Sequence, residues 1–100
     1  MGAPTSDRAG VTQIVRALDE AGWIAMRVDY GDGEYVTAHG VPETVDEVMA
    51  VDDAFVIVAR RGTGEAWVRF VLGNDPEEVV ADYTLSLEDV IGPITEGWWS

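Results

Sequence analysis

The stretch Ala54-Phe55-Val56-Ile57-Val58-Ala59 decides the fold class of this chain. It is apolar on both faces when written as a strand, because successive side chains of a strand point to opposite sides of the sheet. Such a run belongs in the centre of a sheet rather than at its edge. We therefore expect a β-sheet with residues 54–59 in an inner strand.

The segments on either side of this run predict two β-hairpins. After it, residues 60–64 form a Gly-rich turn that leads into an alternating strand over residues 65–72. Before it, residues 24–30 alternate, Gly31-Asp32-Gly33 is a turn, and residues 34–39 form the returning strand. In this interpretation, the residues that point toward the helices are Ile24, Met26, Val28, Val36, Ala38, Val68, Phe70 and Leu72.

Four helices accompany the hairpins in this prediction. The first runs from a cap at Ser6 or Asp7 to Gly22, and the second runs from Pro42 to about Val51. The third extends over residues 74–83, and the fourth begins at Ser86 and ends where Gly92-Pro93 interrupts it.

The expected fold is a single α+β domain over residues 1–100, in the order αββαββαα. A four-stranded antiparallel sheet from the two hairpins carries the helices on one face. Residues 1–6 form a flexible lead, and residues 95–100 form an unassigned tail. The two helix–hairpin halves resemble each other, which leaves an internal duplication open.

Charge is the most unusual property of the composition. The chain has 19 acidic residues against six arginines, has no lysine, and carries a formal net charge of −13. Since an acidic chain repels phosphates, we expect no direct contact with DNA or RNA. The absence of cysteine excludes disulfides and thiolate metal sites. No apolar run reaches the roughly 20 residues of a membrane span, and the first residues do not resemble a signal peptide, so we expect a cytoplasmic protein.

No residue pattern predicts catalysis. His39, the single histidine, lies at the end of a predicted strand without a nucleophile motif, as a surface residue would. The acids and glycines of residues 29–34 fit a hairpin turn better than a calcium loop, and Gly62-Thr63-Gly64 lacks the lysine and the helix of a phosphate loop. The sequence therefore predicts a non-enzymatic protein with no catalytic residue, no metal site and no cofactor.

The acidic residues are the first candidate for a function. Residues 43–53 contain five acids and no base, and Asp75, Glu78 and Asp82 recur at helical spacing on the predicted third helix. Carboxylates arrayed in this way imitate the phosphates of a duplex, so the expected partner is a basic nucleic-acid-binding protein complex. The alternative is an acid-rich surface that serves solubility or adaptation to high salt. The predicted partner-binding acids are Glu43, Asp46, Glu47, Asp52, Asp53, Asp75, Glu77, Glu78, Asp82, Glu88 and Asp89.

The face of the sheet opposite to the helices is the second candidate. Aromatic residues and arginine are enriched at the centres of protein interfaces. This face would bind a partner protein, a second copy in a homodimer, or a small molecule, unless helices or the Trp98-Trp99 tail cover it. The alternation predicts that it carries Trp23, Arg27, Tyr35, Trp67 and Arg69, with His39 beside them.

The chain resembles a family of small, mostly uncharacterised phage and prophage proteins over residues 45–91. Residues 67–75, WVRFVLGND, end a hydrophobic strand in a Gly-Asn-Asp turn, and Asp82-Tyr83-Thr84 and Leu87-Glu88 follow in the family's order. The resemblance implies a phage context and transfers no catalytic residue. Small acidic phage proteins are often inhibitors of host defences, including anti-CRISPR and anti-restriction proteins. We therefore expect an inhibitor of a nucleic-acid-handling defence complex, whose acidic surface competes with DNA for a basic groove.

Overall fold

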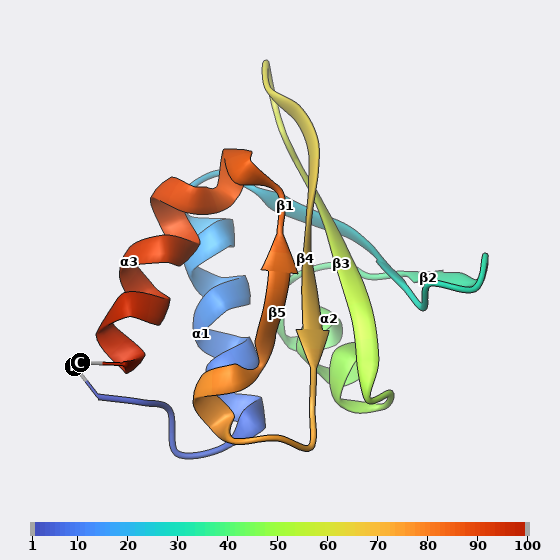
Figure 1. Cartoon of the computed structure of the whole chain (residues 1–100). Coiled ribbons are helices and arrows are strands. Elements are labelled where there is room, and N and C mark those ends of the chain that lie inside the picture. The colour runs from blue at the N-terminus through green and yellow to red at the C-terminus, as the bar shows by residue number, and fades with distance from the viewer. Residues whose placement is uncertain (1, 100) are drawn as a thin grey trace.

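The apolar run of residues 54–59 lies in strand β3 (Asp53–Arg60) of the computed structural model, which describes residues 2–99. The sheet has five antiparallel strands in the order β2-β1-β3-β4-β5, so β3 is its middle strand and the predicted central position is confirmed (Figure 1). The other strands are β1 (Ile24–Asp29), β2 (Tyr35–Thr37), β4 (Gly64–Val71) and β5 (Val80–Tyr83).

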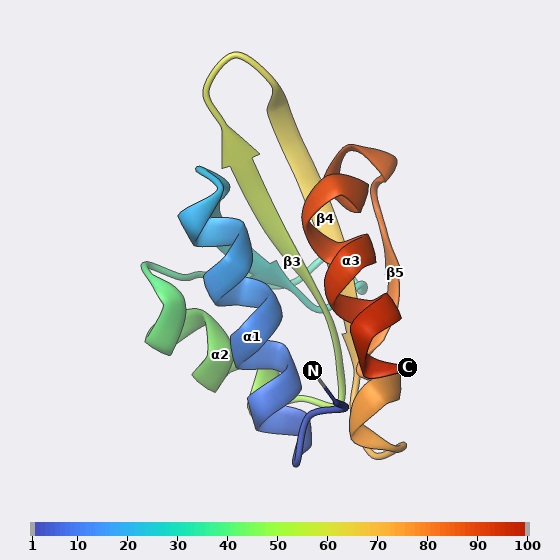
Figure 2. The same cartoon turned by 90° about the vertical axis from the view of Figure 1, so that its left-hand side faces the viewer.

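Three α-helices of the described chain cover one face of this sheet. They are α1 (Asp7–Glu20), α2 (Val41–Met49) and α3 (Glu88–Trp98), and Figure 2 shows α1 between α2 and α3. Helix α1 begins after Ser6, whose hydroxyl accepts a hydrogen bond from the backbone N–H of Ala9 (3.1 Å). Ser6 is thus the cap, out of the two residues that the sequence offers for it, Ser6 and Asp7. The first two predicted helices, the α+β class and the helical layer on one face are confirmed.

The hydrophobic core fills the space between the helices and the covered face of the sheet. One stripe of α1 and every second residue of β3 and β4 contribute to it, together with Trp23, Leu87 and Ile91. Since the side chains of the stripe and of the two strands are almost fully removed from water, their apolar burial stabilises the fold. They are Val11, Ile14, Val15 and Leu18 on α1, Val56 and Val58 on β3, and Val68 and Phe70 on β4.

The two helix–hairpin halves occupy equivalent places in the sheet. The first strands of the halves, β1 and β3, are antiparallel neighbours, and the second strands, β2 and β4, lie outside them. This order is the one that an approximate two-fold axis between β1 and β3 would produce. The similarity of the two halves in sequence therefore has a counterpart in the topology.

The predicted third helix over residues 74–83 is wrong. Only Pro76–Glu78 (η1) form a 3-10 turn, and the residues after it form β5 on the outer side of β4. The reason lies in the tertiary structure around β4. Strand β4 would otherwise present unpaired backbone groups at the edge of the sheet, and pairing with β5 satisfies them while Val79 becomes buried. The sheet therefore has five strands, and Asp75, Glu78 and Asp82 do not share one side of a helix.

The predicted end of the last helix at Gly92-Pro93 is also wrong. A short 3-10 turn, η2 (Leu85–Leu87), leads into α3, which continues through Pro93 to Trp98. A proline in a helix interior costs about 3 kcal/mol, but Ile91 and Trp98 are buried on either side of it, and the indole N–H of Trp98 donates to Oε1 of Gln13 (3.1 Å). Residues 95–98 thus belong to the helix rather than to a tail. Residues 1 and 100, the outermost residues of the predicted lead and tail, lie outside the described part.

The alternation predicted for β1 is wrong in its first half. Ile24 and Met26, expected to point toward the helices, are 52% and 44% exposed, whereas Trp23 is only 1% exposed. The cause is a β-bulge between Ala25 and Arg27, because one extra residue moves every side chain before it to the other face of the sheet.

Gly10 provides a test of the corrected placement of residues 74–83. A Cβ atom at this position would lie 3.0 Å from Cγ2 of Val79 and 3.4 Å from the carbonyl oxygen of Pro76. We expect Gly10→Leu to destabilise the fold by about 1–3 kcal/mol through overpacking, although leucine is the better helix former. Chemical denaturation measures the effect, with Thr12→Leu on the open side of α1 as the matched control. A Gly10→Leu variant as stable as the control would contradict the placement.

Candidate functional site

The face of the sheet opposite to the helices is built from rows of residues that the strand register aligns. One row crosses all five strands, because Asp29 pairs with Tyr35 and Phe55, Phe55 pairs with Arg69, and Arg69 pairs with Asp82. Directly paired residues point to the same side of a sheet. The five side chains therefore share one face, which we call the open face.

A second row supplies the rest of the apolar centre. Arg27 pairs with Ile57, and Ile57 pairs with Trp67. The rings of Phe55 and Trp67 meet edge to face, with their centroids 5.4 Å apart and their planes at 74°. Phe55, Ile57 and Trp67 are all partly exposed, so the centre of the open face is an apolar patch that the described part of the chain leaves in contact with water.

Both arginines of the open face are held by carboxylates. Arg69 binds Asp53 in a two-pronged contact, with Nε 2.9 Å from Oδ1 and Nη2 2.5 Å from Oδ2, and its guanidinium lies 5.5 Å from the centroid of Phe55. The hydrogen bond from Arg69 lowers the pKa of Asp53, and the same contact raises the pKa of Arg69. Arg27 lies 3.5 Å from Glu65 and 5.8 Å from the centroid of the Tyr35 ring.

Of the five residues predicted for this face, the structure brings four together and places one elsewhere. Arg27, Tyr35, Trp67 and Arg69 lie on it as predicted. Trp23 does not, because the bulge in β1 turns it into the core, where the guanidinium of Arg60 lies 4.4 Å from its ring centroid. Sequence reasoning missed Phe55 and Ile57 as members, although the two-sided apolar pattern of residues 54–59 was the signal for them.

The predicted partner-binding acids separate into groups. Asp52 lies in the connection between α2 and β3, and Asp75, Glu77 and Glu78 lie in the connection between β4 and β5. Both connections are at the lower end of the molecule in Figure 1, which we call the acidic end. Its two loops are joined by a hydrogen bond from the backbone N–H of Leu72 to the carbonyl of Asp52 (2.8 Å). These four carboxylates form no hydrogen bond or ion pair with other described residues.

The acids of α2 have partners within the fold. Asp46 forms an ion pair with Arg8, and Glu43 accepts a hydrogen bond from the backbone N–H of His39 (3.1 Å). Glu47 accepts one from the hydroxyl of Tyr30 (3.4 Å), and burial together with this carboxylate raises the pKa of Tyr30.

The remaining predicted acids lie away from the acidic end. Asp82 is on the open face beside Arg69, and Glu88 and Asp89 begin α3. Glu88 accepts a hydrogen bond from the hydroxyl of Tyr83, and this bond, with burial as a second cause, raises the pKa of Tyr83 to about 12. The structure thus concentrates four unpaired carboxylates at one end instead of aligning all of the predicted acids in one track.

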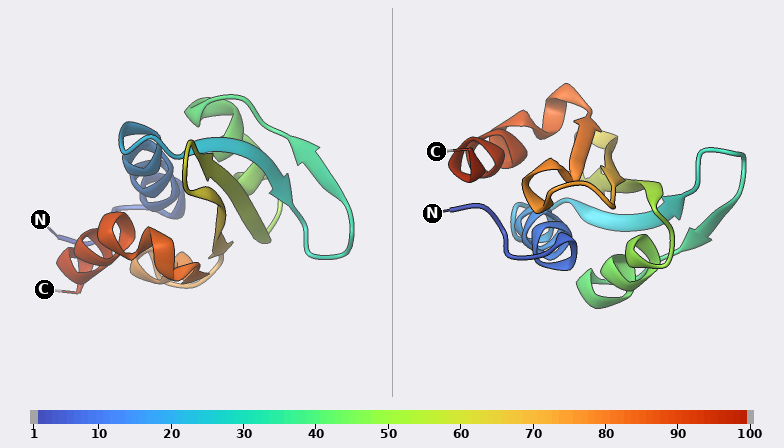
Figure 3. Two further views of the ribbon diagram at one scale, coloured as in Figure 1. Left: turned by 90° about the horizontal axis from the view of Figure 1, so that it is seen from above. Right: turned by 60° about the horizontal axis from the view of Figure 1, so that its bottom comes forward.

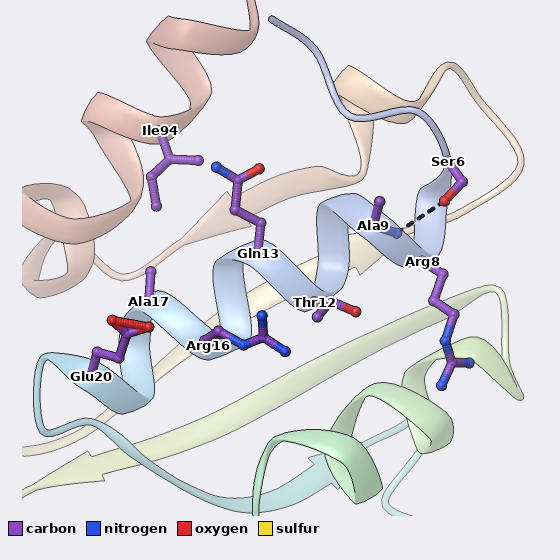
Figure 4. A pocket seen from close by; sticks show the side chains of 9 residues that line it. All are labelled: Ser6, Arg8, Ala9, Thr12, Gln13, Arg16, Ala17, Glu20 and Ile94. Atoms are coloured by element: carbon purple, nitrogen blue, oxygen red, sulfur yellow. Dashed lines mark hydrogen bonds between the residues drawn. The ribbon is translucent and has the colours of Figure 1, made fainter. Parts of the chain in front are cut away.

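A groove of about 610 Å³ runs along the solvent side of α1 and is bordered by α3 (Figure 4). Arg8, Arg16 and Ala17 of α1 line it together with Ile94 of α3. The Arg8 guanidinium forms an ion pair with Asp46, and Oε1 of Gln13 accepts a hydrogen bond from the indole N–H of Trp98. Two of the polar side chains along the groove are therefore engaged within the fold.

Residues 2–99 contain no group of three or more His, Cys, Asp or Glu side chains arranged to hold a metal ion. The acids of the Gly31-Asp32-Gly33 turn serve the turn itself, since Asp29 accepts from the N–H of Gly31 (2.8 Å) and Asp32 from that of Glu34 (2.9 Å). No helix in the same range has the length and apolar character needed to cross a membrane.

No family model, no curated protein and no solved structure matches this chain. Its function is therefore argued from its surfaces, of which the acidic end and the open face are the two candidates.

The ion pair of Asp53 with Arg69 predicts a measurable pH behaviour. Because the pKa of Asp53 in the folded state is below its ordinary value, the pair stabilises the fold above about pH 4, and this contribution is lost as the pH falls through the lowered pKa. We expect Arg69→Gln to return the pKa of Asp53 toward its ordinary value, as followed by NMR titration of the carboxyl carbon. Arg60→Gln is the control, since its guanidinium contacts Trp23 instead. An Asp53 pKa that is unchanged in Arg69→Gln would contradict the pair.

Proposed function

We propose that this protein is a non-enzymatic inhibitor that binds a basic, nucleic-acid-handling protein complex in competition with DNA. The observation that carries the proposal is the large excess of carboxylates that the fold leaves without a cation. Against 19 acidic residues, only Arg8, Arg27 and Arg69 form ion pairs among residues 2–99. Self-repulsion on this scale destabilises a compact chain. Binding to a partner that neutralises the carboxylates would give this excess of negative charge a function.

The acidic end is the part of the surface best suited to imitate nucleic acid. A DNA duplex presents one negative charge per about 1.7 Å of its axis, and proteins grip it by neutralising several phosphates at once. Asp52, Asp75 and Glu78 are exposed, and their carboxylates are not engaged within the described chain. A groove evolved for phosphates could therefore pair with them without first breaking an ion pair inside this protein.

The resemblance of residues 45–91 to small phage proteins supports a particular setting. In that setting the protein is encoded by a phage or prophage and acts in the cytoplasm of the host cell. The complex that it blocks would be a defence system that must bind DNA, as in an anti-CRISPR or anti-restriction protein. Inhibition then requires only occupancy of the DNA-binding groove and no chemical step.

The alternative with an observation of its own is a structural or dimerisation module. The partly exposed Phe55, Ile57 and Trp67 on the open face favour it. The negative charge would then keep the protein soluble or adapt it to high salt. A small-molecule site on this face is less well supported, since Trp23, one of its three predicted aromatic residues, is buried in the core instead.

Charge reversal at the acidic end tests the proposal. We expect Asp52→Lys, Asp75→Lys and Glu78→Lys together to abolish capture of a DNA-binding complex from host lysate at low ionic strength, with circular dichroism unchanged. Exposed substitutions usually change stability by no more than about 0.5 kcal/mol each. The matched control carries Asp19→Lys, Glu20→Lys and Glu34→Lys, which alter the net charge equally at exposed sites elsewhere.

The captured complex should be released by salt and by added duplex DNA, because screening and competition act on the same contacts. A partner that duplex DNA does not displace would contradict the proposal. So would equal loss of capture in the two triple variants, since bulk charge rather than the acidic end would then be responsible.

Thermal melts at different salt concentrations separate a partner-directed charge from adaptation to brine. We expect the isolated protein to be folded in dilute buffer and to gain only about 1 kcal/mol in molar salt, which corresponds to roughly 4–8 °C in Tm for a domain of this size. A chain that folds only in molar salt would support the solvent alternative instead.

A further inference from the structure

The middle strand of the sheet is apolar on two faces, but the fold covers only one of them. Val56 and Val58 point into the core and are almost fully buried, while Phe55, Ile57 and Ala59 point the other way and are partly exposed. Antiparallel sheets that expose one face to water normally carry polar residues there. In Figure 3 the β1–β2 hairpin extends away from the helices, and no drawn segment crosses the open face. The central strand therefore has the composition of a strand covered on both sides.

The charges around this apolar centre are mainly negative. Four carboxylates of the open face, those of Asp29, Asp53, Glu65 and Asp82, accompany two arginines. Both guanidinium groups are already engaged, by Asp53 and by Glu65. One oxygen each of Asp29 and Asp82 accepts a backbone N–H, from Gly31 and Tyr83 respectively, and the other oxygen has no hydrogen bond within the described chain. Although the charge of Arg69 also acts on Asp82, the open face has two more carboxylates than guanidinium groups, and a basic partner would balance this excess.

We infer that the open face is the docking surface for a basic protein segment that carries an aliphatic or aromatic side chain between lysines or arginines. The apolar side chain would pack on Phe55, Ile57 and Trp67, which have the aromatic character of interface hot spots. The flanking cations would pair with Asp29 and Asp82, and one of them could lie over the exposed ring of Tyr35. This inference rests on the proposed function, because it assigns the contact surface used on the same basic partner.

Charge also decides against a second copy as the occupant. Each chain carries −13, so two copies meeting through faces that are themselves net negative would repel each other. A basic segment instead removes the apolar patch from water and neutralises the rim at the same time. The open face and the partner proposed for it are complementary in both respects.

The test uses two synthetic peptides of equal positive charge. In the amphipathic peptide, lysines alternate with leucine and tryptophan, and in the polar peptide serine and glycine replace the apolar residues. Isothermal titration at low ionic strength measures both affinities for the whole chain. We expect the amphipathic peptide to bind about tenfold more tightly, and a double variant Phe55→Thr, Trp67→Thr to remove this advantage.

Threonine suits strands, so the double variant should keep its fold, which thermal melts check. The control is Leu85→Thr with Trp99→Thr, which removes exposed apolar groups outside the sheet and should leave the advantage intact. If the double variant does not fold, backbone NMR shifts of the wild-type chain give the same answer. The shifts caused by the amphipathic peptide should then fall on β3 and β4.

The outcomes distinguish this inference from the proposed function. If both peptides bind equally and the double variant binds like the wild type, the open face is not the docking surface, while charge-driven binding survives. If neither peptide binds, the acidic surface does not attract a basic partner and the proposed function fails with it. A wild-type dimer in sedimentation that the double variant loses would overturn the inference, because the face would then bind a second copy.

Discussion

The packing of helix α1 on the centre of the sheet is the contact on which the rest of the structure depends. Val11, Ile14 and Leu18 contribute to the same core as Val56 and Val68, and all are almost fully buried. A chain of 100 residues has material for one such layer of helices and no second layer. The limited helical cover leaves the outer face of β3 unprotected even though its residues are apolar.

The same core has to outweigh the repulsion among the carboxylates. The fold reduces this cost by giving many acids a local role, as when Asp7 accepts the N–H of Gly73 (3.1 Å) and Glu88 binds the hydroxyl of Tyr83. Ion pairs with exposed partners add little, typically between 0 and about 1 kcal/mol each. Asp52, Asp75 and Glu78 have neither kind of contact, so within the isolated fold nothing offsets their mutual repulsion except screening by the solvent.

Local sequence signals predicted the elements whose pattern and tertiary environment agree. The heptad-like stripe of α1, its cap at Ser6 and the central apolar strand were all readable, because burial and local preference favour the same conformation there. The prediction for residues 74–83 was wrong because the capping pattern around Pro76 initiates only one 3-10 turn. The residues Val80–Tyr83 then pair with the edge of β4 as a fifth strand. Trp23 was predicted on the wrong face because the β-bulge between Ala25 and Arg27 cannot be recognised from the alternation of apolar and polar residues in the sequence. Of the candidate site, the composition predicted the acids, and the strand alternation predicted four residues of the open face. Only the strand register shows that Phe55 lies between Asp29 and Arg69.

The two candidate surfaces meet at the start of β3. Asp52 belongs to the acidic end, whereas the next residue, Asp53, holds Arg69 on the open face, so a single partner could contact both surfaces across this point. The two surfaces would then act at different ranges. Unpaired carboxylates act over several ångströms and mainly raise the rate of encounter with a basic partner, whereas an apolar patch acts only in contact and mainly slows dissociation. A short-lived electrostatic encounter would become a lasting complex only with a partner that also carries apolar side chains. Selectivity among basic proteins would therefore come from the uncovered side of the strand that also builds the core.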